Sequence, residues 1–182
     1  MTYSYICETV SRLKKKYKET DLFELCKAMG ILILERPMGT SEDSVKGFFM
    51  VNKRVRVITV NSDLPDIIMR IIIAHELGHA VLHCGLGVQT FHDVSVFDES
   101  SAMEQQANLF AAELLMDDDD VFEVINQDGT FFSAAANLYV PMELLDFKFR
   151  LMKWKGYKLI EPPITSRSNF LKDMPIPAEY NY

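Results

Sequence analysis

Residues 75–79 of this 182-residue chain read His-Glu-Leu-Gly-His, and this pattern constrains the fold more than any other feature of the sequence. Residues four apart on an α-helix differ in direction by about 40°, so both imidazoles leave the same face and can bind one metal ion. Glu76 lies about 100° around the helix from His75, where its carboxylate can reach a water molecule without binding the metal itself. The pattern therefore predicts a helix with a metal site on one face.

The helix that carries this pattern is predicted to span about residues 64–84. Ser62 or Asp63 suits its N-cap, and Pro65 fits its first turn, where a missing N–H costs nothing. Gly85 follows as a stop signal.

A catalytic zinc site normally has three protein ligands, so a third ligand is expected beyond the two histidines. His83 is about 80° around the helix from His75, and we interpret it as a histidine that supports a ligand or packs in the core. Glu104 is the favoured third ligand, because two histidines and a glutamate form a known catalytic zinc set. Four residues of the intervening loop stay open as alternatives: His92, Asp93, Asp98 and Glu99.

A second helix is predicted at residues 101–116, and it presents Glu104 and Asn108 on one face because they are four residues apart. Asn108 is expected to accept a hydrogen bond from a ligand imidazole and so to fix its tautomer. Glu113 is nine residues from Glu104, points to the opposite side of the helix, and is expected to face solvent.

Hydrophobic periodicity and turn residues predict the remaining elements. Helices are expected at 3–18, 21–29, 133–138 and 141–154, a strand at 31–34, and a hairpin of strands at 47–51 and 55–60. The sheet is expected to be small and antiparallel in part. The acidic run at 117–120 suits a solvated helix start better than a calcium site, because four consecutive residues cannot all face one ion.

The length suits a single domain, predicted to cover residues 1–160. Within it we expect N-terminal helices in 1–30, a catalytic core in 31–116 and C-terminal helices in 117–160. Four of the seven prolines follow Glu161, so residues 161–182 are predicted to form a Pro-rich extended tail.

Composition limits the partners and the compartment. The net charge of -7 argues against direct binding of nucleic acid or an anionic membrane. The three cysteines are widely spaced and predict neither disulfides nor a thiolate metal site. No secretory signal is recognised, and charged residues and histidines interrupt the most apolar stretch, Ile67–Leu82, so we expect a cytoplasmic protein without a membrane-spanning helix.

The helix pair at 133–138 and 141–154 has the spacing of a DNA-reading helix-turn-helix. Apolar residues dominate its second helix and leave little polar surface for contacts with bases. Together with the acidic charge of the chain, this favours a structural role for the pair over DNA binding.

Three segments together resemble the ImmA/IrrE family of zinc metallopeptidases. They are the strand end Ile58–Asn61, the sequence HELGHAVLH at 75–83 and the sequence EQQANLFAAELLM at 104–116. The resemblance implies an α+β, zincin-like fold with a small sheet, an active-site helix and flanking N- and C-terminal helices. Family members usually have a proline where this chain has Asp117, which affects the helix boundary and not the site.

The resemblance also implies the chemistry. It assigns one Zn²⁺ ion to His75, His79 and Glu104, and the role of general base to Glu76. It further implies a protein substrate, since family members cleave a helix-turn-helix repressor and so derepress a mobile element, a prophage or a stress response.

A zinc endopeptidase is therefore the leading hypothesis, with the strand at 55–60 expected to offer an edge to which an extended substrate adds. The alternative is a non-catalytic, protein-binding regulatory module that keeps the zincin scaffold. Glu76 argues against this alternative, because a purely structural metal site has no use for a base beside its ligands.

Overall fold

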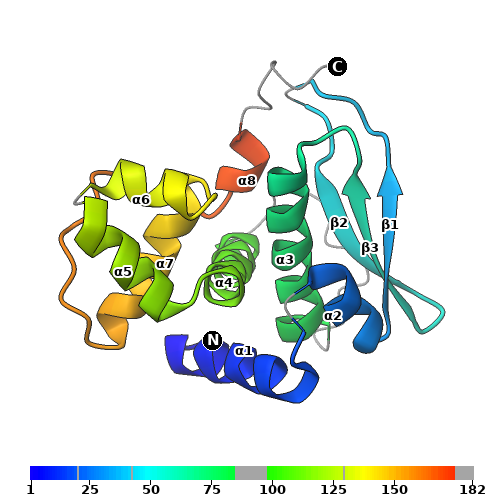
Figure 1. Ribbon diagram of the computed structural model, residues 1–182. Coiled ribbons are helices and arrows are strands. Elements are labelled where there is room, and N and C mark those ends of the chain that lie inside the picture. The colour runs from blue at the N-terminus through cyan, green and yellow to red at the C-terminus, as the bar shows by residue number, and fades with distance from the viewer. Residues whose placement is uncertain (20, 42, 85–97, 129, 175–182) are drawn as a thin grey trace.

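The structure is a computed structural model that describes residues 1–19, 21–41, 43–84, 98–128 and 130–174 (Figure 1). The elements in chain order are α1 (Tyr3–Tyr17), α2 (Leu22–Ala28), β1 (Ile31–Arg36), β2 (Gly47–Asn52), β3 (Val55–Asn61), α3 (Asp66–Leu82), α4 (Asp98–Leu115), α5 (Asp118–Asp128), α6 (Phe131–Asn137), α7 (Met142–Trp154) and α8 (Phe170–Asp173). Helix α3 lies between the sheet and α4, and α5, α6 and α7 lie on the far side of α4 (Figure 1). The predicted α+β class is confirmed.

The sheet has the strand order β1-β3-β2, with β1 parallel and β2 antiparallel to β3. The expectation of a small, partly antiparallel sheet is confirmed. The expectation that the strand at 55–60 offers a free edge is wrong, because β3 is the central strand and pairs on both sides. Parallel pairing of β1 with β3 joins segments that are distant in sequence, and hydrophobic periodicity does not report such pairing.

The buried amide of Asn61 organises the loop that leads into β2. Its Oδ1 accepts hydrogen bonds from the N–H groups of Met38 (3.0 Å) and Asp63 (3.0 Å). Its Nδ2 donates to the carbonyls of Gly39 (2.8 Å) and Val45 (3.1 Å). One side chain thus satisfies four backbone groups that would otherwise be unpaired, and it fixes where β2 begins.

Helix α3 is the centre of the core, and every residue from Ile71 to Ala80 is buried. Pro65 is its N-cap, and neither of the caps predicted from the sequence is used. The Asp63 carboxylate instead accepts a hydrogen bond from the N–H of Gly39 at 2.7 Å. The tertiary contact thus takes the place of the local cap.

Gly78 allows α3 and α4 to approach closely. A Cβ at this position would lie 3.1 Å from the Cα and 3.2 Å from the carbonyl oxygen of Ala107. These contacts are with backbone atoms, which cannot rotate away as the end of a side chain can. The glycine of the His-Glu-Leu-Gly-His pattern is therefore a packing requirement, and it determines how near the two helices lie.

The far face of α4 is covered by α7, and not by solvent. The prediction that Glu113 faces solvent is therefore wrong: its side chain is only 13% exposed. Its carboxylate lies 2.8 Å from Nζ of Lys148 and 2.6 Å from Nζ of Lys155. Both lysines also pair with Asp118, at 2.6 and 2.8 Å. Glu113 does lie on the side of α4 opposite Glu104, but helix geometry alone does not show that α7 packs against that side.

The C-terminal segment returns to the core. Residues 161–169 contain no helix or strand. The short helix α8 follows, and its Phe170 and Leu171 are buried in the core. Residues 175–182 of the predicted tail lie outside the described residues.

The helix pair that was considered for DNA reading, α6 and α7, is held within the fold. Eight of the 13 residues of α7 are buried, including Leu144, Phe147 and Leu151. Within the described ranges, no helix has the length and apolar character that crossing a bilayer requires.

Lys148 provides a test of the buried ion-pair network. Its side chain is 1% exposed, so Lys148→Met leaves the carboxylates of Glu113 and Asp118 with Lys155 alone. We expect a loss of about 3–5 kcal/mol in the free energy of unfolding, measured by urea denaturation. The control is Lys27→Met in the exposed pair with Glu24, which should change it by less than about 0.5 kcal/mol. Equal effects of the two substitutions would contradict the assignment.

The same network predicts a pH dependence. Burial raises the pKa of Asp118, but hydrogen bonds from Lys148 and Lys155 outweigh it and hold that pKa below its ordinary value. A lowered folded-state pKa stabilises the fold above the unfolded pKa of about 3.9, and this is lost as the pH falls through the folded-state value. The destabilisation by Asp118→Asn should therefore be full near pH 7 and shrink below about pH 3.9. A difference that stays constant in urea denaturation across this range would contradict it.

Candidate metal centre

The structure brings His75 and His79 of α3 together with Glu104 of α4. The Nε2 atoms of the two histidines lie 3.1 Å apart. Glu104 Oε2 lies 3.1 Å from Nε2 of His75, and Oε1 lies 3.2 Å from Nε2 of His79. Among the described residues, these three form the group of His, Cys, Asp or Glu side chains that could hold a metal ion.

The spacing of these atoms fits a tetrahedral ion. Ligands at about 2.0–2.1 Å from a tetrahedral zinc are separated by about 3.3–3.4 Å, close to the separations given above. His75 and His79 are almost fully buried, at 5% and 1% exposure, and Glu104 is partly buried. Imidazole nitrogens and carboxylate oxygens that converge in a buried site repel one another unless a cation lies among them. The residues present therefore fit a metal ion.

The pKa values in the cluster show the same demand for positive charge. Burial lowers the pKa of His75, but the hydrogen bond and charge of Glu104 outweigh it and raise that pKa above the ordinary value. Burial raises the pKa of Glu104, and hydrogen bonds from His75 and His79 reverse this and lower it strongly. Burial lowers the pKa of His79 to about 4. The cluster thus favours one positive charge beside an ionised carboxylate.

Asn108 lies behind His75, as expected from its position four residues after Glu104. Its Oδ1 lies 2.8 Å from Nδ1 of His75, and both groups are buried. An amide oxygen can only accept, so Nδ1 of His75 keeps a proton, and Nε2 is the nitrogen that a metal ion can bind in place of its proton. This is the tautomer that a metal ligand needs.

His83 supports the second histidine from behind. Its Nδ1 lies 3.1 Å from Nδ1 of His79, and its Nε2 lies 3.1 Å from Oε1 of Gln106. The Gln106 oxygen accepts a hydrogen bond from the Nε2–H of His83, and Nδ1 of His83 then accepts one from the Nδ1–H of His79. Nε2 of His79 is thus the nitrogen that can bind a metal ion.

Glu76 is buried beside the cluster and is not part of it. Its Oε2 has no hydrogen-bond partner in the part of the chain that the structure describes. Burial raises the pKa of Glu76 to about 7, although the charge of His75 and the backbone N–H of Phe49 in β2 oppose the shift. A buried carboxyl with an unsatisfied oxygen and a pKa near neutrality has the properties of a general base.

Sequence reasoning missed the two outermost partners of this site. Gln106 lies on the predicted helix of Glu104, but no spacing in the sequence links its amide to His83 on the other helix. The carbonyl of Ser168, which accepts from Nδ2 of Asn108 at 2.5 Å, carries no sequence signal. Of the alternative ligands, His92 and Asp93 lie outside the described residues. Asp98 and Glu99 were expected in the loop but lie in the first turn of α4, and their side chains are not described.

Comparison with known proteins identifies the family. The family model described as the IrrE N-terminal-like domain, which defines a family of peptidases, matches residues 26–150. The chain belongs to the ImmA/IrrE family. It is 33% identical over 146 residues to "Uncharacterized immunity region protein 2" of Bacillus phage phi105, covering 80% of this chain and 90% of that protein. It is 30% identical over 144 residues to "Metallopeptidase ImmA" of Bacillus subtilis (strain 168), covering 76% of this chain and 80% of that protein.

The resemblance drawn from residues 55–116 is thereby confirmed, and membership of ImmA/IrrE implies a metallopeptidase that holds a metal ion. The group His75, His79 and Glu104 is able to bind one.

Glu104→Ala tests whether the third member of the group binds the metal. Because it removes the carboxylate that faces both Nε2 atoms, the affinity for Zn²⁺ should fall by at least about 100-fold, as measured by competition with a chelator. The control is Gln105→Ala, at an exposed position of the same helix, which should keep the affinity of the unaltered protein. Retention of full affinity by Glu104→Ala would contradict this assignment.

Proposed function

We propose that this protein is a zinc-dependent endopeptidase in which His75, His79 and Glu104 hold one Zn²⁺ ion. The observation that carries the proposal is the buried carboxyl of Glu76 beside these residues, with an oxygen that lacks a hydrogen-bond partner among the described residues. A metal site that serves only the fold gains nothing from such a group. The alternative of a non-catalytic binding module leaves Glu76 unexplained.

Zinc suits this set of ligands better than the common oxygen-binding cations. Two imidazoles and one carboxylate form a catalytic zinc set, whereas Ca²⁺ and Mg²⁺ prefer oxygen ligands alone. When bound, zinc supplies Lewis acidity, which polarises the scissile carbonyl and lowers the pKa of a water molecule.

Glu76 supplies the proton transfers. Its carboxylate takes a proton from the attacking water and later passes it to the nitrogen of the leaving amine. Burial raises the pKa of this carboxyl, which strengthens it as an acceptor of the proton. Asn108 and His83 keep the two imidazoles in the orientation and tautomer that the metal requires.

An extended substrate would bind along strand β2 and not along the central strand β3. It is an edge strand of the sheet, and its Phe49 N–H bonds to the Glu76 carboxylate. No strand among the described residues pairs with its outer edge. A peptide added there as a further strand would run past Glu76 and be held through its backbone.

We propose a helix-turn-helix transcriptional repressor as the substrate, and derepression of a mobile element, a prophage or a stress response as the outcome. The similarity to a protein named for a phage immunity region supports this setting. The similarity to a protein named metallopeptidase ImmA supports the cleavage reaction. We place the reaction in the cytoplasm, where such a repressor acts, with no direct contact of this protein with nucleic acid or membrane.

Glu76→Gln tests the mechanism. The substitution keeps the size of the side chain and removes the base, so zinc stoichiometry should be unchanged while cleavage falls by about 10²–10⁴-fold. Cleavage is followed with a helix-turn-helix repressor from the same genome and, in parallel, with unfolded casein. A matched control is Glu123→Gln, at an exposed position on α5, which should cleave like the unaltered protein.

Each result has one meaning. Equal cleavage by Glu76→Gln and the unaltered protein would contradict the role of Glu76. If the zinc-loaded enzyme cleaves neither the repressor nor casein, the proposed peptidase activity is contradicted. Cleavage of casein alone would contradict the repressor as substrate.

A further inference from the structure

We propose that the C-terminal segment, residues 161–174, sets the affinity of the metal site by fixing the amide of Asn108 and, through it, the tautomer of His75. The proposal rests on the metal site of the proposed function, but not on peptide cleavage. The segment contacts the site through the carbonyl of Ser168, which accepts a hydrogen bond from Nδ2 of Asn108 at 2.5 Å.

The carbonyl of Ser168 determines which way the Asn108 amide points. A backbone carbonyl can only accept, so the NH₂ group of Asn108 must face it. The oxygen of Asn108 then faces His75, where Oδ1 and Nδ1 lie 2.8 Å apart. His75 therefore keeps a proton on Nδ1, and Nε2, which faces Glu104 and His79, is the nitrogen left to bind a metal ion.

Without this carbonyl the amide can turn over. The NH₂ group of Asn108 would then donate to Nδ1 of His75, and the neutral imidazole would carry its proton on Nε2 instead. That nitrogen cannot bind a metal ion until the proton is lost or moved. A flipped amide therefore competes directly with metal binding.

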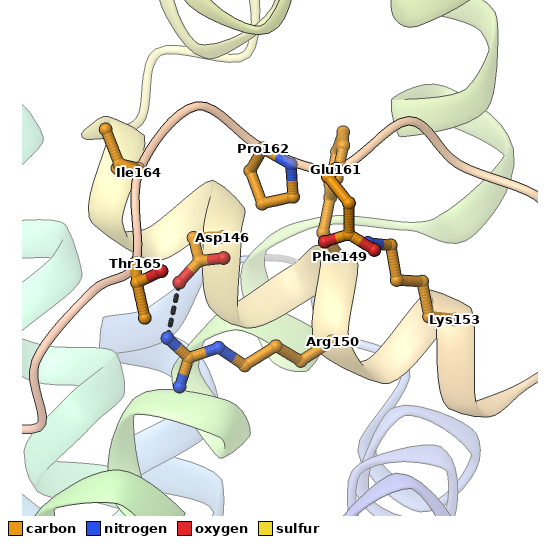
Figure 2. Close-up of a pocket in the computed structure, with 8 residues that line it drawn as sticks. All are labelled: Asp146, Phe149, Arg150, Lys153, Glu161, Pro162, Ile164 and Thr165. Carbon is orange, nitrogen blue, oxygen red and sulfur yellow. Dashed lines mark hydrogen bonds and ion pairs between the residues drawn. The ribbon is translucent and has the colours of Figure 1, made fainter.

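A clamp on α7 holds the segment just before Ser168. The buried Asp146 carboxylate accepts from the N–H of Ser166 at 2.9 Å, and Arg150 donates to the carbonyl of Ser166 at 2.8 Å. Asp146 and Arg150 also pair with each other at 2.5 Å. Figure 2 shows this pair beside Thr165, in the wall of a cavity of about 280 Å³ between α7 and residues 161–165.

An apolar anchor holds the segment just after Ser168. Phe170 and Leu171 are buried, and the rings of Phe170 and Phe147 lie 5.7 Å apart. The guanidinium of Arg150 lies 4.5 Å above the ring of Phe147, which joins the anchor to the clamp. The chain is thus fixed at Ser166 and at Phe170, each two residues from Ser168. The Ser168 carbonyl therefore has little freedom to move away from Asn108.

The segment lies outside the part of the chain that the family model matches, which ends at residue 150. The ligands and Asn108 lie inside that range, whereas Ser166, Ser168 and Phe170 follow it. We infer that this chain completes the surroundings of its metal site with residues beyond the shared domain.

Asp146→Ala tests the proposal, since it removes the acceptor for both Ser166 and Arg150. The affinity of the 182-residue protein for Zn²⁺ should fall by about 10–100-fold, because Asn108, the outer partner of His75, loses its fixed orientation. Competition with a chelator measures this affinity. The matched control is Lys153→Ala on the same helix. It breaks the 2.6 Å pair with Glu161 of the same segment but touches neither Ser166 nor Ser168, and its affinity should be unchanged.

Asn108→Asp separates positioning from a general loss of structure. A carboxylate accepts from Nδ1 of His75 whichever way it points, so it needs no help from Ser168 to set the tautomer. Its second oxygen would face the Ser168 carbonyl and be repelled by it, so in the Asn108→Asp background Asp146→Ala should not lower the zinc affinity further. Nitrogen-15 NMR of the histidines adds a direct readout when the metal-free protein is held at a pH at which the ring of His75 is neutral. Under that condition Asp146→Ala should move the proton of His75 from Nδ1 to Nε2.

Several outcomes would overturn the inference. The first is an unchanged zinc affinity in Asp146→Ala, and the second is an unchanged His75 tautomer in that variant. The third is a loss of zinc affinity, when Asp146→Ala is added to Asn108→Asp, as large as the loss that Asp146→Ala causes alone. The last result would mean that the clamp acts through the fold and not through the amide. Failure of the unaltered protein to bind zinc would overturn this inference and the proposed function together, whereas zinc binding without peptide cleavage would overturn only the latter.

Discussion

The close contact of α3 with α4 at Gly78 is the constraint on which the site depends. The glycine lets the backbone of Ala107 approach, and this places the Glu104 carboxylate within about 3 Å of both histidine Nε2 atoms. A larger residue at this position must push the helices apart by a few tenths of an ångström, which is a large fraction of the tolerance of a metal site. The glycine between the ligands is thus as much a part of the site as the ligands are.

The site brings together buried polar groups that repel one another unless a cation lies among them. Four atoms that can present lone pairs converge in a buried place, and the cost is offset only by a cation among them. Outer hydrogen bonds make the set ready in advance: Asn108 acts on His75, and His83 with Gln106 acts on His79. Glu76, held from the β2 side by the N–H of Phe49, completes the chemistry without entering the metal set.

The sequence predicted what depends on local spacing and missed what depends on tertiary packing. The helical spacing of His75 and His79 showed that they could converge, and the structure brings Glu104 to them. The opposite side of α4 was assigned to solvent because the sequence does not show that α7 covers Glu113. In the same way, β3 was taken for an edge because its parallel partner lies 25 residues earlier in the chain. The contact of Ser168 is made by a backbone carbonyl, which every residue has, so no pattern of side chains could reveal it.

The most direct test of this account is X-ray absorption at the zinc edge on the protein loaded with one equivalent of Zn²⁺. We predict a shell of nitrogen and oxygen neighbours at about 2.0–2.2 Å, with the outer-ring scattering of two imidazoles and no sulfur. A sulfur neighbour at about 2.3 Å would indicate a cysteine ligand such as Cys84 and contradict the site. Scattering from one imidazole or from three would contradict the assignment of His75 and His79 as the two histidine ligands.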